Sequence, residues 1–409
     1  MLAIPFYFLL VSSQNKRIVA GQKNIMVAYS VSESNYISTI QGVEPIKNYN
    51  KQAQFSSLNK KVYQNYQETI FTLGKIQIKL SLIANIFGVM FLIGLLFFNA
   101  NQVLKGSLKI GELMATIGIC GSLLPSIANL ALISIPFNEA KIAFDRMFEF
   151  TTLDKEKEEN NLFIEKFESL KCSNLSFRFA GRSPIIKNIS FEIKKGEVIA
   201  IMGENGCGKS TLTQLLMKNY EQENGEIIIN NSKKINDISI SDWRKIVGVI
   251  PQSIHIFNGT VLENICFEDA IEKPDKVFNF LQANGFSSFL DSLPQSVYTL
   301  VGEEGINLSG GQKQIIAFAR ALYFKPQLLI IDEGTSAMDR LSEQFVINLI
   351  QKLKNEIAVI FITHRLHILK SFSDKIYVLE NGSITIEGNH EFLMTSDNLY
   401  SKYWNDLQS

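Results

Sequence analysis

The sequence is organised around nine residues that fit the phosphate-binding pattern G-x-x-x-x-G-K-[ST]. They are Gly203-Glu204-Asn205-Gly206-Cys207-Gly208-Lys209-Ser210-Thr211. The apolar run 198–202 before them predicts a buried strand, and leucines at helical spacing follow them. The glycines therefore lie between a strand and a helix N-terminus, which is the context that the pattern requires. A glycine-rich turn that matches by chance is the alternative, and it does not explain these neighbours.

Each residue type in this stretch suits a chain of phosphates. Glycines let backbone N–H groups approach oxygen atoms that a side chain would keep away, and the helix N-terminus adds partial positive charge. Lys209 supplies a mobile charge for the outer phosphates, and the Ser210 hydroxyl suits Mg²⁺. We interpret Cys207 as a tolerated small residue and not as a catalytic thiol.

Length and composition restrict the class of protein. A chain of 409 residues predicts two or more domains. Lys and Arg number 40 and Asp and Glu also number 40, so net charge gives no support to nucleic-acid binding. The four cysteines are far apart and form no C-x-x-C pair, which argues against a zinc site or a disulfide framework.

The first third of the chain has the composition of a membrane domain. The runs 80–98 and 113–138 are long and apolar enough to predict two spans, with Pro125 tolerated inside the second. Residues 1–13 are apolar but too short to span, and they lack the basic region of a signal peptide. Buried core helices are the alternative for both runs.

Loop charge orients the two predicted spans. Lysine and arginine outnumber acidic residues in 14–79, whereas the link 99–112 carries few charges, so 14–79 is expected in the cytoplasm. Apolar residues at helical spacing in 14–79 predict long amphipathic helices that continue the spans inward. Pro45 disfavours helix at Glu44 and predicts a short turn at 42–45, with a solvated loop as the alternative.

Two alternating segments, 171–179 and 189–193, predict strands of an antiparallel sheet. Phe177 and Phe179 fall on the same face of the first segment. One of them could stack on an adenine ring, although packing in the core is the more common fate of a strand phenylalanine. The acidic stretch 154–161 predicts an exposed linker. These features predict domains at 1–150 and 164–409, joined by a linker at 151–163.

A second apolar run, Leu328-Leu329-Ile330-Ile331, ends in the acidic pair Asp332 and Glu333. A carboxylate at the tip of a strand beside the phosphate loop can hold Mg²⁺, and we assign this role to Asp332. Glu333 faces another direction and is placed to orient or deprotonate an attacking water. A structural explanation is weak because two buried unpaired carboxylates would cost several kcal/mol each.

The stretch Leu308-Ser309-Gly310-Gly311-Gln312 predicts the start of another helix, with Ser309 as its N-cap. Glycines at a helix N-terminus expose backbone donors and predict a second anion site. One chain cannot easily bring both sites to one phosphate tail from opposite sides, so the pattern hints at a partner copy.

These motifs and their order resemble the ATPase cassette of ABC transporters, and the preceding spans make the chain similar to an exporter half-transporter. The most similar group is that of bacterial peptide and bacteriocin exporters, which often carry an N-terminal cysteine-peptidase domain. The resemblance implies an α/β P-loop NTPase cassette with a RecA-like core, an antiparallel β subdomain and a helical subdomain, preceded by a partial all-α transmembrane domain. It implies an ATPase in the cell membrane with a cytoplasmic cassette and ATP and Mg²⁺ at its site.

Further roles follow from the resemblance alone. Phe179 matches the aromatic residue that stacks on adenine, and Gln252 matches the glutamine that links Mg²⁺ and water to the membrane domain. His364 matches the histidine that contacts the γ-phosphate and Glu333. Asp339 ends the loop 336–339, which crosses to the partner cassette. The segment at Glu303 matches the part of the cassette that contacts the intracellular loops of the membrane domain in the family. The turn at 43–47 resembles the coupling segment of the membrane domain that docks on the cassette.

The family works as a head-to-tail cassette dimer of two copies or of two homologous half-transporters. Each ATP would lie between one copy's 203–211 loop and the other copy's 309–312. The expected partners are thus a second half, membrane lipid and a cargo of peptide type, with no nucleic acid. The family has six membrane helices per half, and this sequence supplies about two and part of another, without a peptidase domain. A soluble ABC ATPase and a truncated, non-transporting remnant are the alternatives.

Overall fold

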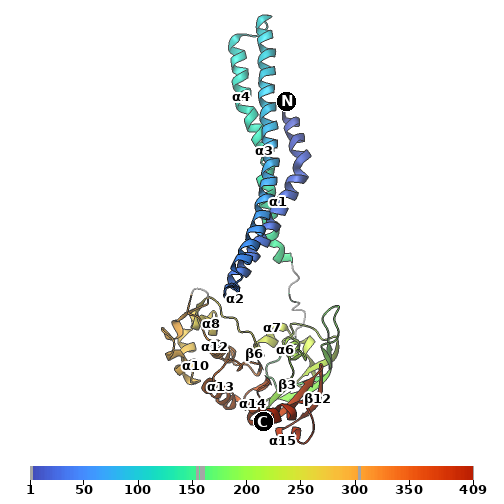
Figure 1. Cartoon of the computed structure of the whole chain (residues 1–409), viewed down its shortest axis with the longest axis vertical. Helices are drawn as coiled ribbons and strands as arrows, with labels where there is room; N and C mark the ends of the chain where they lie inside the picture. The colour runs from blue at the N-terminus through green and yellow to red at the C-terminus, as the bar shows by residue number, and fades with distance from the viewer. Residues whose placement is uncertain (1–2, 153–155, 157–161, 303–304, 409) are drawn as a thin grey trace. The chain divides into compact units, whose positions relative to one another are not determined.

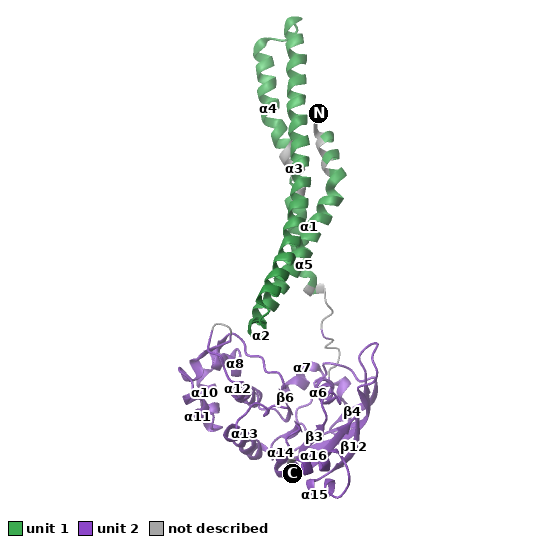
Figure 2. Ribbon diagram, viewed as in Figure 1, with its two compact units in different colours: residues 1–155 green, residues 156–409 purple. Residues whose placement is uncertain are grey.

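The computed structural model describes residues 3–152, 156, 162–302 and 305–408. The chain divides into two compact units, residues 1–155 and residues 156–409, which Figure 2 shows in different colours. Most of the predicted linker (153–155 and 157–161) and residues 303–304 lie outside the described residues. Among the linker residues that are described, Glu156 accepts two hydrogen bonds of 2.8 Å from the Arg244 guanidinium through its carboxylate.

The first unit is helical. Its elements are α1 (Ala3–Gln41), α2 (Val43–Asn48), α3 (Gln52–Leu104), α4 (Ile110–Leu132), α5 (Ser134–Phe148) and the short 3-10 helix η1 (Glu149–Thr152). The long helices α1, α3 and α4 lie side by side (Figure 1). Two segments, Gln52–Leu104 and Ile110–Ile127, are long and apolar enough to cross a membrane by length and composition. The two predicted spans overlap these segments, and long helices also occupy most of 14–79 as expected.

The second predicted span is shorter than expected. Residues 113–138 do not form one helix, because α4 ends at Leu132 and α5 begins at Ser134. Pro136 explains the break: it has no N–H to donate to the carbonyl of residue 132, and its ring would clash with that carbonyl in a continuous helix. Pro125, in contrast, lies inside α4 without ending it.

The predicted turn at 42–45 is also corrected. The chain does leave α1 at Gly42, but residues Val43–Asn48 form the short helix α2. Pro45 is the third residue of α2, where its missing N–H would have had no helical partner, so proline is tolerated there. Burial of Ile46 on this helix adds an apolar contact that sequence rules for the residue before proline do not include.

The second unit is built on a six-stranded sheet. Its strands, in spatial order, are β12 (Ser383–Gly388), β11 (Lys375–Glu380), β3 (Val198–Gly203), β10 (Ala358–Ile362), β9 (Leu328–Asp332) and β6 (Val247–Ile250). All neighbours are parallel except the pair β11 and β12. The strands β3, β9 and β10 are fully buried apolar runs, as expected for parallel strands covered on both faces. Their carboxyl ends therefore meet along one edge.

The predicted antiparallel sheet is present, with a correction at its edge. Its order is β2 (Ile186–Lys194), β1 (Ser169–Phe177), β4 (Asn224–Ile229) and β5 (Lys233–Lys234). β1 ends at Phe177, so Phe179 is not a strand residue as the alternation suggested. The backbone turns back after this point, with the Arg182 N–H donating to the carbonyl of Phe179. A separate two-stranded sheet pairs β7 (Gly259–Thr260) with β8 (Leu300–Val301).

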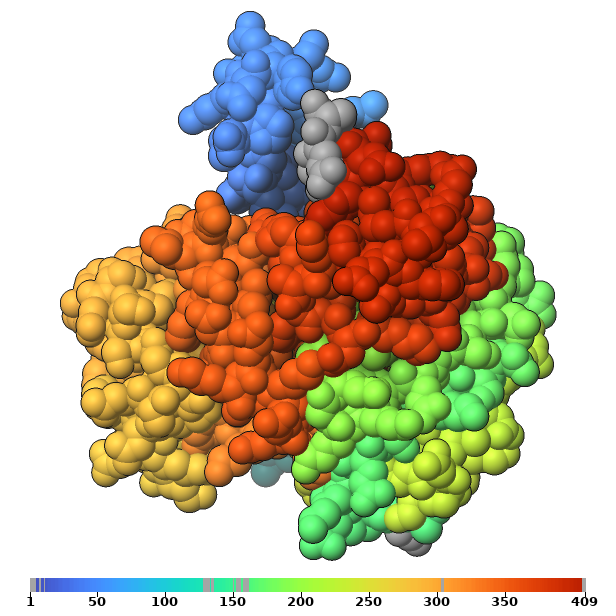
Figure 3. Space-filling view, turned by 90° about the horizontal axis from the view of Figure 1, so that it is seen from below, coloured from blue at the N-terminus to red at the C-terminus, as the bar shows by residue number. Residues whose placement is uncertain are grey.

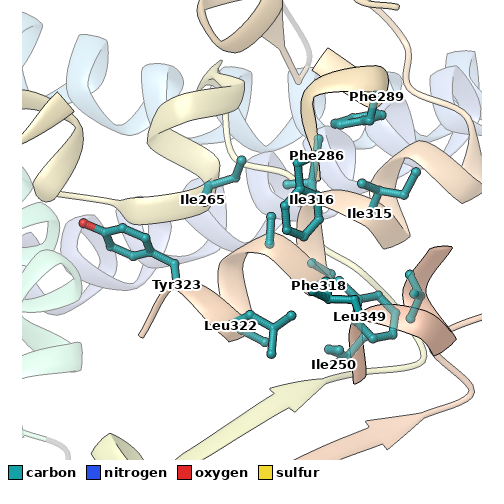
Figure 4. Close-up of a cluster of buried hydrophobic side chains, with 14 of the residues drawn as sticks. Ile250, Ile265, Phe286, Phe289, Ile315, Ile316, Phe318, Leu322, Tyr323 and Leu349 are labelled. Atoms are coloured by element: carbon teal, nitrogen blue, oxygen red, sulfur yellow. The ribbon is translucent and has the colours of Figure 1, made fainter. Parts of the chain in front are cut away.

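Helices cover the sheets and form a helical part between residues 261 and 323. They are α6 (Lys209–Leu216), α7 (Ile240–Ile246), α8 (Val261–Cys266), α9 (Asp269–Glu272), α10 (Pro274–Ala283), α11 (Ser287–Asp291), α12 (Gly310–Tyr323), α13 (Arg340–Leu353), α14 (Leu366–Phe372), α15 (His390–Leu393) and α16 (Leu399–Gln408), with 3-10 turns η2 (Ile235–Asp237) and η3 (Ser296–Tyr298). Figure 4 shows α12 side chains such as Phe318 packed with Phe286 and Leu349 in one buried cluster. In Figure 3 the C-terminal residues (red) lie beside the residues of the first strands of the cassette (green), and the strand β11 pairs with β3.

Candidate nucleotide site

The phosphate loop connects β3 to α6, as the sequence predicted. Gly208 is the N-cap of α6 and has φ of +109°, a conformation that L side chains rarely adopt. A Cβ at Gly208 would lie 2.8 Å from Ile186 Cδ1, and one at Gly203 would lie 2.3 Å from the carbonyl oxygen of Leu379. Both positions therefore require glycine for conformation or space.

Lys209 is buried and is held by the loop itself. Its ammonium group donates to the carbonyl oxygens of Gly203 and Glu204, each at 2.8 Å, and lies 4.0 Å from the Cys207 sulfur. Burial raises the pKa of the Cys207 thiol, with the Lys209 charge acting in the opposite direction. A neutral thiol packed against Gly203 agrees with the interpretation of Cys207 as a small loop residue.

Asp332 ends β9 and is 4% exposed. Burial raises the pKa of its carboxyl, and hydrogen bonds from Ser210 and Thr213 act in the opposite direction. Within the part of the chain that the structure describes, no donor reaches its buried Oδ1. A buried carboxylate oxygen without a protein partner is costly, and it suits a bound cation. Asp332 and the Ser210 hydroxyl are thus brought together as predicted for a magnesium site.

Glu333 is the centre of a second small cluster. Gln252 Nε2 donates to its Oε2 at 2.8 Å, and His364 Nδ1 lies 3.5 Å from its Oε1. The three residues follow the parallel strands β6, β9 and β10, so the sheet places them together although they are far apart in sequence. Glu333 itself has φ of +51°, in the left-handed region, which is uncommon for a residue other than glycine.

The predicted second anion site is a well-capped helix start. Ser309 is the N-cap of α12: its Oγ accepts from the N–H of Gln312 at 3.2 Å, and the Gln312 side chain accepts from the N–H of Ser309 at 2.9 Å. Ser309, Gly311, Gln312 and Asp339 line one pocket. Asp339 also caps α13 by accepting from the N–H of Ser342 at 2.9 Å. Hydrogen bonds from the Ser342 side chain and from this N–H lower the pKa of the Asp339 carboxyl.

An aromatic residue that sequence reasoning missed lies beside Phe179. The Tyr220 ring is 5.3 Å from Phe179 and 5.5 Å from Phe177, measured between ring centroids, and Phe177 and Phe179 meet edge to face at 5.1 Å. Phe177 is buried and fills the core role that its strand position favoured, whereas Phe179 is half-buried. Tyr220 follows α6 in a polar segment without periodicity, so no pattern in the sequence marks it.

Together these parts define a class of protein. A phosphate loop between a central parallel strand and a helix, an acidic pair ending another strand of the same sheet, and a separate capped glycine helix start are the components of a P-loop nucleotide-binding cassette. The assigned roles of the individual residues remain predictions, whereas their positions follow from the sheet.

Comparison with known proteins identifies the family. The description "ABC transporter" matches residues 186–336, and "ABC transporter transmembrane region" matches residues 1–124. The chain belongs to the ABC transporter family and carries both its membrane region and its nucleotide-binding cassette. It is accordingly a membrane protein.

Two relatives and one solved structure illustrate the similarity. The chain is 36% identical over 319 residues to the leukotoxin translocation ATP-binding protein LktB of Mannheimia glucosida and to that of Mannheimia haemolytica, with 76% of this chain and 44% of each relative covered. The chain thus spans less than half the length of these relatives. The fold matches the structure of a bacterial Atm1-family ABC exporter with ATP bound, with a TM-score of 0.90, 24% identity and coverage of 100% of this chain and 72% of that one.

Proposed function

We propose that this chain is the ATP-hydrolysing subunit of an ABC exporter, which couples ATP binding and hydrolysis to transport of a peptide or protein cargo across the membrane. The observation that carries the proposal is the Glu333 carboxylate, held between Gln252 and His364 beside the phosphate loop. The similarity to leukotoxin translocation proteins supports export and a polypeptide cargo. Two segments able to span a membrane argue against a soluble ATPase.

In this proposal the residues of the site have separate tasks. Backbone N–H groups of 203–211 and the Lys209 ammonium hold the phosphates of ATP, and Phe179 stacks on the adenine with Tyr220 behind it. Glu333 accepts a proton from the attacking water or orients it, and Gln252 and His364 keep its carboxylate in one position. Hydrolysis would be in-line attack of water on the γ-phosphate.

The residues around Asp332 fit a divalent cation. Its unpartnered Oδ1 and the Ser210 hydroxyl are oxygen ligands of the kind that Mg²⁺ prefers. Gln252 would be the third protein ligand of the cation. When bound, Mg²⁺ neutralises negative charge on the phosphate oxygens. The protein's own contribution is to keep a carboxylate buried at this point, next to the Lys209 charge.

Two copies, or this chain with a homologous half-transporter, would form the working unit. Ser309, Gly311 and Gln312 line a pocket with Asp339 and so offer a surface for the nucleotide held by another cassette. The helix α2, at the end of two long helices, is the part that we expect to transmit motion between membrane region and cassette. Membrane lipid and the cargo are the remaining partners of the proposal.

Substitution of the central carboxylate tests the proposal. Glu333→Gln keeps the shape of the side chain but removes the base, so we expect turnover to fall by about 100-fold or more, in line with the usual contribution of a general base, while ATP binding persists. The full chain in lipid nanodiscs would be assayed for phosphate release and for retained nucleotide. Glu356→Gln, the same change at an exposed position before β10, is the matched control.

The outcomes separate the parts of the proposal. Loss of turnover with retained Mg-ATP in Glu333→Gln, and normal turnover in Glu356→Gln, support it. Undiminished hydrolysis in Glu333→Gln would show that Glu333 is not the base. Cargo is tested separately by ATP-dependent uptake of peptides into inverted vesicles, and ATP hydrolysis without any such uptake would contradict the export function.

A further inference from the structure

Gln314 lies on α12, two residues beyond the predicted second anion site, and its side chain is 3% exposed. Its Oε1 accepts from the N–H of Ala337 at 3.1 Å, and its Nε2 donates to Ser336 Oγ at 3.3 Å and to the carbonyl oxygen of Glu333 at 3.5 Å. Both ends of this buried amide are therefore directed at the loop 333–339, between β9 and α13. A satisfied buried amide of this kind fixes the segment that it contacts.

The same loop is also bonded to the half-buried Arg365, which forms an ion pair with Glu343. Arg365 Nη2 donates to the carbonyl oxygen of Ser336 at 2.8 Å. The guanidinium is anchored on Glu343, a buried carboxylate of α13, which also contacts His367 Nε2 at 2.8 Å. Ser336 is thus bonded through its hydroxyl to α12 and through its carbonyl to the residue that follows His364.

Direct packing joins the loop to the first turn of α12. A Cβ at Gly310 would lie 2.7 Å from the Cβ of Ala337, and a Cβ at Gly311 would lie 3.1 Å from the Ala337 carbonyl oxygen. Glycine at positions 310 and 311 is therefore required by the close packing of Ala337, in addition to its expected role of exposing backbone donors. The two glycines allow the loop to approach the helix start closely enough for the Gln314 hydrogen bonds.

The conformation of Glu333 depends on these contacts. Its backbone is in the left-handed region, and its carbonyl oxygen accepts from both Gln314 and the N–H of Ser336, the latter at 3.1 Å. A strained residue keeps its conformation only where its surroundings determine it. The direction of the Glu333 carboxylate, and hence its contact with Gln252, is therefore set in part from α12.

We propose that Gln314 is a positioning residue that links the start of α12 to the catalytic carboxylate, through the loop 333–339. This inference rests on the proposed function, in which α12 contacts the nucleotide of the partner cassette while Glu333 acts on the nucleotide of its own. Movement of the helix start by one ATP is then transmitted to the carboxylate that serves the other ATP. Gln314 thereby couples the two sites.

The test replaces the amide by a side chain of similar size. Gln314→Met keeps the buried volume but removes the three hydrogen bonds, and Gln344→Met makes the same change at an exposed glutamine of α13. Hydrogen exchange of the full chain without nucleotide is measured first. We expect exchange at the Ala337 amide to become about tenfold faster in Gln314→Met, as for a locally opened segment, and to stay unchanged in Gln344→Met.

Steady-state hydrolysis at varied ATP concentration is measured second. We expect kcat of Gln314→Met to fall about tenfold with KM within about twofold, and the Hill coefficient to approach 1, since binding is kept and coupling is lost. Unchanged exchange at Ala337 would overturn the contact. A lower melting temperature with normal kcat and Hill coefficient would overturn the positioning role, and absence of hydrolysis in the unsubstituted chain would instead contradict the proposed function.

Discussion

Two helices of the cassette begin next to glycines, and they begin in different ways. α6 starts after Gly208, and among the described residues no side chain caps it. α12 starts after Ser309, whose hydroxyl and backbone N–H are both bonded to Gln312. The first turn of α6 thus has N–H donors without a side-chain cap, which a ligand can satisfy, whereas the capping box of α12 already satisfies some of the donors at its own start.

The difference shows how one chain can carry two anion sites that differ in their ability to bind phosphates alone. The start of α6 combines a glycine at positive φ, N–H donors without a side-chain cap and a buried lysine, so it is suited to bind phosphates by itself. The start of α12 is stable without a ligand and carries no basic side chain in its first turn before Lys313. We therefore expect α12 to complement a nucleotide that is already held by another loop, and the predictions below test this division.

The largest effect is expected at Gly208. Gly208→Ala forces a Cβ into a φ of +109° and to within 3.2 Å of the Ile185 carbonyl oxygen. Strain of about 1–3 kcal/mol corresponds to a loss of Mg-ATP affinity of roughly 5- to 150-fold. Gly206→Ala is the matched control, since φ is +84° there but no atom lies within 4 Å of the added Cβ. Equilibrium binding that weakens equally in both variants would contradict the geometric argument.

A smaller effect is expected at Ser309. Ser309→Ala removes an N-cap, so the free energy of unfolding should fall by about 1 kcal/mol, while ATP affinity of the dilute chain stays within about twofold. ATP-dependent association of two chains should weaken about five- to tenfold, because the helix start is less well formed. Denaturant unfolding, equilibrium binding and light scattering measure the three quantities.

Thr260→Ala is the control for this prediction, because Thr260 and Glu263 form the same capping box at the start of α8. It should lose similar stability without weakening association. If Ser309→Ala weakened ATP binding by the dilute chain, the proposed division between the two helix starts would be wrong.

The smallest effect concerns the thiol inside the phosphate loop. Burial raises the pKa of Cys207, so below this pKa the thiolate fraction, and with it the alkylation rate, should rise about tenfold per pH unit. Bound Mg-ATP should slow alkylation of Cys207 several-fold by covering the loop. Cys266, whose pKa is raised to about 11 in α8, is the internal reference and should not respond to ATP. Mass spectrometry of the alkylated peptides measures both, and equal protection would argue against nucleotide at the loop.

Local patterns predicted the parts of the cassette that depend on neighbours in sequence. The strand before Gly203, the strand ending in Asp332 and the N-cap at Ser309 are each set by an apolar run or by a side chain close to its own backbone. The sequence also indicated the antiparallel sheet and the long helices of 14–79. The assignment of roles to Gln252 and His364 came from resemblance, and the sheet explains why these two residues meet.

The features that were missed depend either on where a proline lies in a helix or on tertiary contacts. Helix α2 persists across Pro45 because proline occupies its first turn, and the break before α5 follows from Pro136, whose effect is not included in a count of apolar and charged residues. Gln314 has no signal in the sequence, since a glutamine on a helix is usually exposed. Its significance depends on a loop more than twenty residues away, which only the packed fold brings to it.

The contacts of Lys209 have a consequence for how substrate is captured. An ammonium group has three N–H donors, and here two of them are bonded to backbone carbonyls while the remaining neighbour is a sulfur atom at 4.0 Å. An arriving phosphate oxygen needs to replace only that weak third contact. The rotamers of the lysine are already restricted before any encounter, so binding loses little side-chain entropy. Capture should therefore be fast, with an association rate limited by diffusion into the loop and not by rearrangement of the cation.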